Sequence, residues 1–372
     1  MRQGMFARIA VALLLVCVGL TTFGQGGVAS AASAPAGAVY ALTNAADGNA
    51  VAIFNRAGDG TLTAASSVPT GGLGTGAGLG SQGALAFGKN GKLLFAVNAG
   101  SNEISTFKVG KTGLTLVDRV ASGGVLPISL TTHDDTLYVL NAGASGNITG
   151  FRIREGKLVP LPDTTRPLSS AAADPAQVQF NPDGDLLAVT EKATNTIDTY
   201  RIDDGAISGP FAQPAVGTTP FGFVFDDDNR LIVSEAFGGA AGAGAVSSYR
   251  VEDDGAISPA TGSLANQQSA PCWVALSKNG RYAYVANTGS GTVSAYKVGD
   301  EGALTLLNGV AGVTGDGTRP ADLGVSKNGR FLYVRNGGTG TISAFRVQSN
   351  GGLVSLGTTG ALLSGSAGIA IR

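Results

Sequence analysis

Short apolar runs alternate with polar turns along most of the chain, and the pattern recurs seven times. In each repeat an apolar strand ends in Asn or Glu. A second strand follows in which Val or Ile precedes Phe or Tyr by three residues, as in Val293 and Tyr296, although the first repeat, Val51-Ala52-Ile53-Phe54, is shifted by one. Intervals of 43 to 54 residues separate the strand-ending positions, which are Asn44, Asn98, Asn141, Glu191, Glu235, Asn287 and Asn336. A period of this length is typical of propeller blades.

Each repeat also contains two further strand segments. A Gly-led turn such as Gly302-Ala303-Leu304 introduces the last strand, and most repeats open with a proline-led strand. Proline suits the first residue of a strand because it has no N–H to contribute to the ladder. Asn-Gly turns between apolar runs, as in Lys278–Arg281 and Lys327–Arg330, predict tight hairpins. The sequence therefore predicts an all-β fold, a seven-bladed β-propeller of four-stranded antiparallel blades.

The two ends of the repeat array complement each other. The first repeat begins at Ala38 with its second strand and lacks an opening strand, whereas residues 366–372 resemble an opening strand that no repeat follows. Pairing the C-terminal strand into the first blade would close the ring and remove an exposed edge. We expect residues 32–372 to form a single propeller domain that is closed in this way.

The first 31 residues have the features of a secretory signal peptide. Arg2 and Arg8 precede the apolar stretch Ile9–Leu20, and small residues follow up to a cleavage site near Ala31. The apolar stretch is shorter than the roughly 20 residues that a membrane-spanning helix needs, and no later stretch approaches that length. We expect a secreted, extracellular protein without a membrane span. After cleavage Cys272 is the remaining cysteine, so no internal disulfide is expected.

Composition narrows the function classes. Glycine accounts for 58 of 372 residues without a period of three, which excludes collagen, and 43% hydrophobic residues allow a packed core, which excludes general disorder. The formal net charge is −1 and no basic block stands out, so we expect no nucleic-acid partner. No helix follows the glycines from Gly71 to Gly80, so they do not predict a nucleotide-binding loop. We expect a monomer with a small-molecule ligand and without a cofactor or metal.

The sixth and seventh repeats carry a family motif. Gly280–Asn287, followed by Gly291–Tyr296 and Gly302-Ala303-Leu304, resembles the lactonase-type propellers, which include 6-phosphogluconolactonase-like and carboxymuconate-lactonising proteins. The motif recurs as Gly329–Asn336 and Gly340–Phe345, and more weakly elsewhere. This resemblance implies the propeller fold over essentially the mature chain and, as an activity, hydrolysis of a lactone. A competing family with repeated Tyr-Val-Thr-Asn strings often binds rather than catalyses, but its repeats tend to be shorter and lack the regular Gly-x-Leu strand.

The histidines that the resemblance implies are missing. Family members thought to be active resemble one another in a His-Pro-His string at the start of an opening strand, with Arg and Glu nearby. The corresponding positions here read Leu126-Pro127-Ile128, Ala270-Pro271-Cys272 and Arg319-Pro320-Ala321. The one histidine, His133, falls at the far end of an opening strand, and we expect it in a turn on the opposite face.

Other polar residues gather at the rim where second strands end and opening strands begin. Five of the seven strand ends are Asn, which we interpret as turn chemistry, and two in neighbouring blades are Glu191 and Glu235. Either glutamate is a candidate general base for water, with a solvated rim or a salt bridge as the alternative. Arg335 and Arg319 are candidates for binding an oxyanion or an acidic substituent, or they are ordinary surface arginines.

A polar-leaning column lies two residues after the entrance prolines, and we expect it to face the channel. Its members are Ser129, Gln177, Gly222, Trp273 and Asp322. Gln177, Trp273 and Asp322 are the ligand-binding candidates in this column, with Arg319 beside them. Packing between blades is the alternative for Trp273.

Two functions of different classes remain. The first is hydrolysis of a lactone or cyclic ester at the channel rim, with Glu191 or Glu235 activating water and Arg335 or Arg319 stabilising the oxyanion. The second is a non-catalytic extracellular propeller that binds a small ligand, a carbohydrate-like molecule or a protein. The missing histidines, the export signal and the low charge favour the second function, whereas the family resemblance favours the first.

Overall fold

The computed structural model describes Met1 and residues 34–111, 113–360 and 362–372. Residues Pro35–Arg372 form one compact unit built almost entirely of β-strands. The predicted cleavage site near Ala31 and the apolar stretch Ile9–Leu20 lie outside the described residues. Within the described ranges, no helix is long and apolar enough to cross a membrane.

Seven antiparallel sheets, the predicted blades, follow one another around the ring. Blade 1 consists of β29 (Ala367–Ile371), β1 (Gly37–Leu42), β2 (Ala50–Arg56) and β3 (Leu62–Pro69), and blade 2 of β4 (Leu85–Phe87), β5 (Leu93–Asn98), β6 (Glu103–Val109) and β7 (Leu114–Ala121). Blade 3 consists of β8 (Pro127–His133), β9 (Thr136–Asn141), β10 (Asn147–Arg154) and β11 (Lys157–Pro160), with β12 (Arg166–Pro167) pairing to β10. Blade 4 consists of β13 (Pro175–Phe180), β14 (Leu186–Glu191), β15 (Thr196–Asp203) and β16 (Ala206–Pro214). Blade 5 consists of β17 (Pro220–Phe225), β18 (Arg230–Glu235), β19 (Ala245–Val251) and β20 (Ile257–Ala265). Blade 6 consists of β21 (Pro271–Leu276), β22 (Tyr282–Asn287), β23 (Thr292–Val298) and β24 (Leu304–Val313). Blade 7 consists of β25 (Pro320–Val325), β26 (Phe331–Asn336), β27 (Thr341–Val347) and β28 (Leu353–Thr359). Short 3₁₀ turns occur at η1 (Lys89–Gly91), η2 (Phe237–Gly239) and η3 (Asp300–Gly302). The fold is therefore the predicted seven-bladed propeller.

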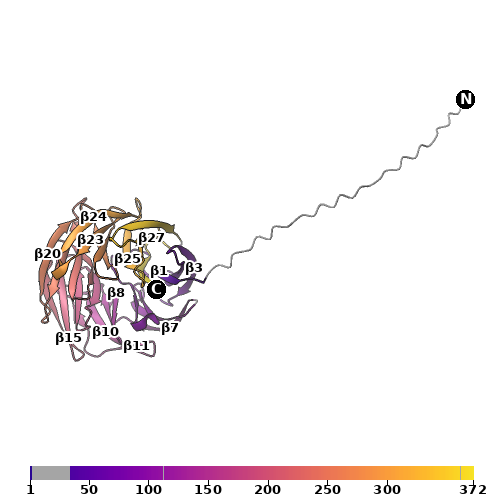
Figure 1. The fold of residues 1–372 in the computed structure, drawn as a ribbon. Coiled ribbons are helices and arrows are strands. Elements are labelled where there is room, and N and C mark those ends of the chain that lie inside the picture. The colour runs from indigo at the N-terminus through magenta and orange to yellow at the C-terminus, as the bar shows by residue number, and fades with distance from the viewer. Residues whose placement is uncertain (2–33, 112, 361) are drawn as a thin grey trace. The chain divides into compact units, whose positions relative to one another are not determined.

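The first strand of each blade lies innermost. β8 packs against β13, β13 against β17, β17 against β21, and β21 against β25, and β29 and β4 complete the circle back to β8. The other three strands of each blade extend outward from this circle, as Figure 1 shows for the labelled strands around β8 and β25. The innermost strands therefore surround a central channel.

The aromatic residue of each third strand is buried, with an exposed fraction of 1% or less. These residues are Phe54, Phe107, Phe151, Tyr200, Tyr249, Tyr296 and Phe345. Each contributes roughly 1.5–3 kcal/mol on full burial. Tyrosines of the second strands also join neighbouring blades, because Tyr333 Oη donates to the carbonyl oxygen of Gly60 at 2.8 Å. Aromatic packing between blades thus stabilises the ring, and Cys272, the cysteine of the described part of the chain, is free.

The C-terminal strand completes the first blade, as the sequence predicts. β29 pairs with β1 in antiparallel register, with Tyr40 opposite Ala370 and Ala41 opposite Ile369. The backbone N–H of Arg372 donates to the carbonyl oxygen of Ala38 at 2.8 Å. In Figure 1 the C-terminus lies next to β1. The first blade is thus assembled from both ends of the propeller.

Removing residues 369–372 is expected to lower the free energy of unfolding by at least about 4 kcal/mol. The deletion loses the buried side chain of Ile369, which contributes roughly 1.5–3 kcal/mol, and several ladder hydrogen bonds of about 1 kcal/mol each. Thermal and urea unfolding of the truncated and full chains measures the loss. Arg372→Ala, which keeps the backbone pairing, is the control. Equal stability of the truncated and full chains would show that closure does not stabilise the ring.

Candidate functional site

The inner edges of the innermost strands face the channel, so some of their backbone N–H and C=O groups have no neighbouring strand. The column of residues two positions past the entrance prolines supplies partners for them. Ladder register shifts at this column, between Pro127 and Ser129 in β8 and between Pro175 and Gln177 in β13. Ser129 Oγ accepts a hydrogen bond from the backbone N–H of Val178 in the next blade at 3.2 Å. The column therefore links one innermost strand to the next.

Two glutamines continue this pattern. Gln177 Oε1 accepts from the N–H of Phe223 at 2.8 Å, and Gln177 Nε2 donates to the carbonyl oxygen of Phe223 at 2.9 Å. Gly222, the next column member, has no side chain, and Gln82 makes the equivalent pair of bonds with Val274, at 3.2 and 2.9 Å. A Cβ atom on Gly222 would lie 2.5 Å from Gln82 Oε1. Gln82 did not stand out in the sequence, although the gap in the column at Gly222 is a signal that could have found it.

A cavity of about 260 Å³ lies within the channel. Polar side chains from the loop before β4 and from three innermost strands line it, namely Gln82, Thr131, Thr132, Gln177, Gln179 and Asp322. Among the described residues that line this cavity, Asp322 is the only one with an ionisable side chain. Gln177 and Asp322, two of the ligand-binding candidates, are therefore brought together here.

Asp322 occupies an unusual position for a carboxylate. Its exposed fraction is 2%, and its φ of +89° lies in the left-handed region that a non-glycine residue rarely adopts. The carboxylate accepts from the N–H of Leu323 at 2.9 Å and of Gly83 at 3.5 Å. Burial raises the pKa of Asp322 to about 7, although the charge of Arg335 and the N–H groups of Gly83, Leu323 and Ile369 lower it. Near neutral pH this carboxyl group can therefore accept or release a proton.

The two candidate arginines have different surroundings. Arg335 is 4% exposed, and burial lowers its pKa to about 10 while the charge of Asp322 raises it. One guanidinium nitrogen, Nη1, donates to the carbonyl oxygen of Ser366, whereas Nε has no hydrogen-bond partner in the described part of the chain. Arg319 is exposed, and its carbonyl oxygen accepts from the N–H of Gly337 at 3.0 Å. Arg335 is thus the arginine that interacts with Asp322.

Glu191 is fully buried at the end of β14. It accepts hydrogen bonds from Ser169 N at 2.9 Å, Ser169 Oγ at 2.6 Å and Thr194 Oγ1 at 2.6 Å. Ser169 N also donates to Asp198 Oδ2 at 3.0 Å, so two carboxyl groups share one donor. Burial first, and then the hydrogen bond and charge of Glu191, raise the pKa of Asp198 to about 8. The pair therefore holds a proton at neutral pH.

Glu235 is likewise fully buried, at the end of β18. It accepts from Gly217 N at 2.9 Å, from Ser263 Oγ at 2.5 Å and from Ser247 Oγ. Asn287 has the same place in blade 6 and also binds hydroxyl groups of its own blade. Neither rim glutamate is among the residues that line the channel cavity. Their role as general bases stays a prediction, and the observed contacts tie each one to loops and strands of its own blade.

Trp273 packs between blades 5 and 6. Its exposed fraction is 3%, and its ring meets Phe221 edge to face with centroids 4.8 Å apart. Lys192, which directly follows β14 in blade 4, places its Nζ 4.8 Å from the centroid of the Phe221 ring. The indole Nε1 has no hydrogen-bond partner among the described residues. Trp273 thus adjoins the channel without forming an open stacking surface.

The fold and this channel agree with a known family. The model of the lactonase family, a seven-bladed β-propeller, matches residues 34–171 and 241–362, which together span well over half of the chain. The chain belongs to this family. None of the curated proteins matches the sequence.

Several solved structures share the architecture. A candidate 6-phosphogluconolactonase from Bacteroides fragilis superposes with a TM-score of 0.70 at 20% identity, covering 92% of this chain and 99% of that one. The periplasmic gluconolactonase of Pseudomonas aeruginosa superposes with a TM-score of 0.68 at 18% identity, covering 90% and 98%. A protein from Lactobacillus plantarum gives a TM-score of 0.74 at 16% identity, covering 90% and 99%. At these identities the likeness establishes the fold.

The single histidine of this lactonase-family chain lies away from the channel cavity. His133 ends β8, next to the turn to β9, and its ring is 5.7 Å from that of Phe180. It is not among the residues that line the cavity. The ionisable chemistry of the cavity therefore depends on Asp322.

Asp198→Asn is expected to increase stability at alkaline pH. An acid whose folded pKa is raised keeps its proton in the folded state and loses it in the unfolded state, so stability falls as pH rises from about 4 to about 8. Asn retains a donor toward Glu191 without a proton to lose. We expect a gain of roughly 1–3 kcal/mol at pH 8.5 relative to wild type, and little change at pH 4, from urea unfolding.

The raised pKa of Asp322 also makes the free energy of unfolding fall as pH rises, so part of this pH dependence should persist in the Asp198→Asn variant. Asp185→Asn, on an exposed turn, is the matched control. Parallel stability curves for wild type and Asp198→Asn across this pH range would contradict the shared proton.

Proposed function

We propose that this protein hydrolyses a small hydroxylated lactone in its central channel, with Asp322 as the group that exchanges protons with water. The observation that carries the proposal is the position of Asp322, a cavity-lining carboxyl group whose pKa lies at about 7. Membership of the lactonase family supports the reaction class. The names of the Pseudomonas and Bacteroides neighbours support a sugar lactone as the substrate class.

The reaction needs one proton acceptor and one anion partner. Ionised Asp322 takes a proton from water as the water oxygen attacks the lactone carbonyl carbon, and it returns this proton to the ring oxygen when the C–O bond breaks. Arg335, which carries an unpartnered Nε and interacts with Asp322, is the candidate for stabilising the negative charge that develops. Gln177 is the candidate for orienting the substrate from the cavity wall.

The charge of the cavity favours an unphosphorylated substrate. Among the described lining residues the carboxyl group of Asp322 is the only ionisable one, so a phosphate group on the substrate would meet a like charge there. Arg335, which is not among the lining residues, is assigned to the developing oxyanion, so the described lining offers no second cation for a phosphate. Export by the predicted signal peptide at residues 1–31 would also place the protein outside the compartment of phosphorylated sugars. Glucono-δ-lactone is therefore a better test substrate than its 6-phosphate.

Asp322→Asn is expected to reduce kcat for glucono-δ-lactone at least about 100-fold, because a general base typically contributes 10²–10⁴. Wild type should prefer the neutral lactone over the 6-phosphate. The rate is measured by proton release in weak buffer, corrected for spontaneous hydrolysis, and circular dichroism checks the fold. Undiminished kcat in Asp322→Asn would refute the assignment of Asp322.

The double variant Glu191→Gln/Glu235→Gln tests whether the general base lies at the rim or in the channel. If it keeps wild-type turnover, the glutamates are structural; if it alone loses turnover while folded, the base is at the rim. The second candidate function is ligand binding without catalysis. It is favoured by the absence of histidine at the proline-led entrances and by the Gln82 side chain across the channel. Binding of the lactone without turnover in any of these proteins would select it.

A further inference from the structure

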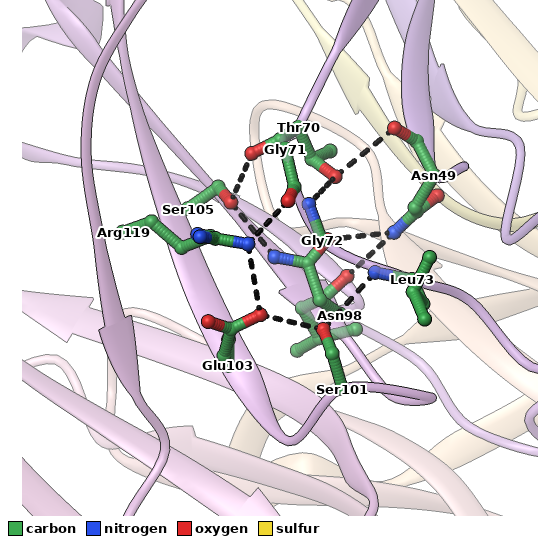
Figure 2. Close-up of polar contacts among 11 residues, drawn as sticks. Asn49, Thr70, Gly71, Gly72, Leu73, Asn98, Ser101, Glu103, Ser105 and Arg119 are labelled. Carbon is green, nitrogen blue, oxygen red and sulfur yellow. Dashed lines mark hydrogen bonds and ion pairs between the residues drawn. The ribbon is translucent and has the colours of Figure 1, made fainter.

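The connection from blade 1 to blade 2 is rich in glycine and fixed at its start. Seven of the 14 residues in Thr70–Gly83 are glycine, which gives this loop many accessible backbone conformations. Figure 2 shows how the start is held: the Arg119 guanidinium donates to the carbonyl oxygen of Gly71, and the N–H of Leu73 donates to Ser101 Oγ at 3.0 Å. The loop therefore leaves blade 1 from a base that is tied to blade 2.

The end of the same loop crosses the channel. Ser81 Oγ donates to the carbonyl oxygen of Ile128 in blade 3 at 2.8 Å. Lys192 Nζ in blade 4 donates to the carbonyl oxygen of Gly80 at 3.2 Å. Gln82 reaches blade 6, on which its carboxamide makes the two bonds described above. Three separate blades thus hold residues 80–82 in place.

The contact between Gln82 and Val274 resembles the recognition of a ligand. Gln82 presents a carbonyl acceptor and an N–H donor on one carbon to the N–H and C=O of a single residue. The corresponding pairs between other neighbouring innermost strands come from the column itself, but Gly222 leaves Val274 without such a partner. When Gln82 moves away, the N–H and C=O of Val274 lose these partners, and buried backbone groups require partners.

An α-hydroxylactone presents matching groups. Its carbonyl oxygen is an acceptor, and the hydroxyl group on the adjacent carbon is a donor. These two groups can bind the N–H and the carbonyl oxygen of Val274 in the way that the Gln82 carboxamide does. A lactone without the α-hydroxyl group satisfies the N–H alone.

We propose that Gln82 acts as the lid of the channel and occupies the place of an α-hydroxylactone at the Val274 backbone. The ligand displaces Gln82, and residues 78–82 move away from the channel. The segment up to Ala77 stays fixed, because Asn44 Nδ2 donates to the carbonyl oxygen of Ala77 at 2.5 Å and Asn44 Oδ1 accepts from the N–H of Thr75 at 3.1 Å. The identity of the ligand as a lactone rests on the proposed function, whereas its displacement of Gln82 does not require turnover. Gln82 is accordingly a positioning residue for the closed state and does not take part in the chemistry.

The test measures binding of glucono-δ-lactam, a stable amide that keeps the carbonyl and α-hydroxyl groups. Trp273 is the single tryptophan and precedes Val274, so its fluorescence reports occupancy. We expect Gln82→Ala to bind the lactam about 10-fold more tightly than wild type, because the competing closed state is removed. Gln82→Glu keeps the acceptor and loses the donor, so a smaller gain is expected. Gln348→Ala, on an exposed turn, is the matched control and should bind as wild type does.

A 2-deoxy lactam, which lacks the α-hydroxyl group, should gain less from Gln82→Ala than the parent lactam. Equal lactam affinity in wild type, Gln82→Ala and Gln82→Glu would overturn the lid. An equal gain for both lactams would overturn the α-hydroxyl assignment. If Gln82→Ala does not fold, the lactam affinity of Gln82→Glu relative to wild type decides whether Gln82 acts as a lid.

Turnover separates this proposal from the proposed function. Asp322-dependent hydrolysis with unchanged lactam affinity in the Gln82 variants refutes the lid and keeps the lactonase. Tighter binding in Gln82→Ala without turnover in any variant keeps the lid and refutes the lactonase.

Discussion

The unpaired inner edges of the innermost strands are the constraint on which this propeller depends. Backbone N–H and C=O groups that face a narrow channel must find partners, because leaving them buried and unpaired is costly. The chain solves this with one side chain per gap: Ser129 for Val178, Gln177 for Phe223, and a residue of the connecting loop for Val274. The same side chains that stabilise the ring therefore form the wall of its cavity.

This double role explains why the cavity is polar and nearly uncharged. A hydroxyl or carboxamide group can pair with a peptide group at modest desolvation cost, whereas each ionised group in such a place requires compensation. Asp322 is the exception. Its compensation comes from several N–H groups and from the positive charge of Arg335, yet burial still dominates and leaves its pKa near neutrality. A position that contacts the loop before β4 is thereby suited to proton transfer.

The repeat period, the third-strand aromatics and the incomplete first repeat carried enough information to predict the blade number and the closure, and the structure confirms both. The rim was harder. Glu191 and Glu235 could be placed at strand ends from the pattern, but their partners Ser169 and Gly217 come from irregular connections that no periodicity locates. Gln82 binds Val274, which is 192 positions away in sequence. Such a contact follows from the closed ring and from one missing side chain at Gly222, not from a local motif.

The closing strand and the loop that carries the lid both contact the carboxyl group of Asp322. Asp322 receives N–H bonds from Gly83, which directly follows the lid residue, and from Ile369 of the closing strand. Each of these bonds stabilises the ionised form, so each lowers the pKa of Asp322. Gly83 itself lies outside the segment that moves, because its carbonyl oxygen accepts from the N–H of Leu130 in blade 3 at 2.8 Å. The ionised form of Asp322 therefore keeps the support of the Gly83 and Ile369 N–H groups when a ligand takes the place of Gln82, as its proposed role as a base requires.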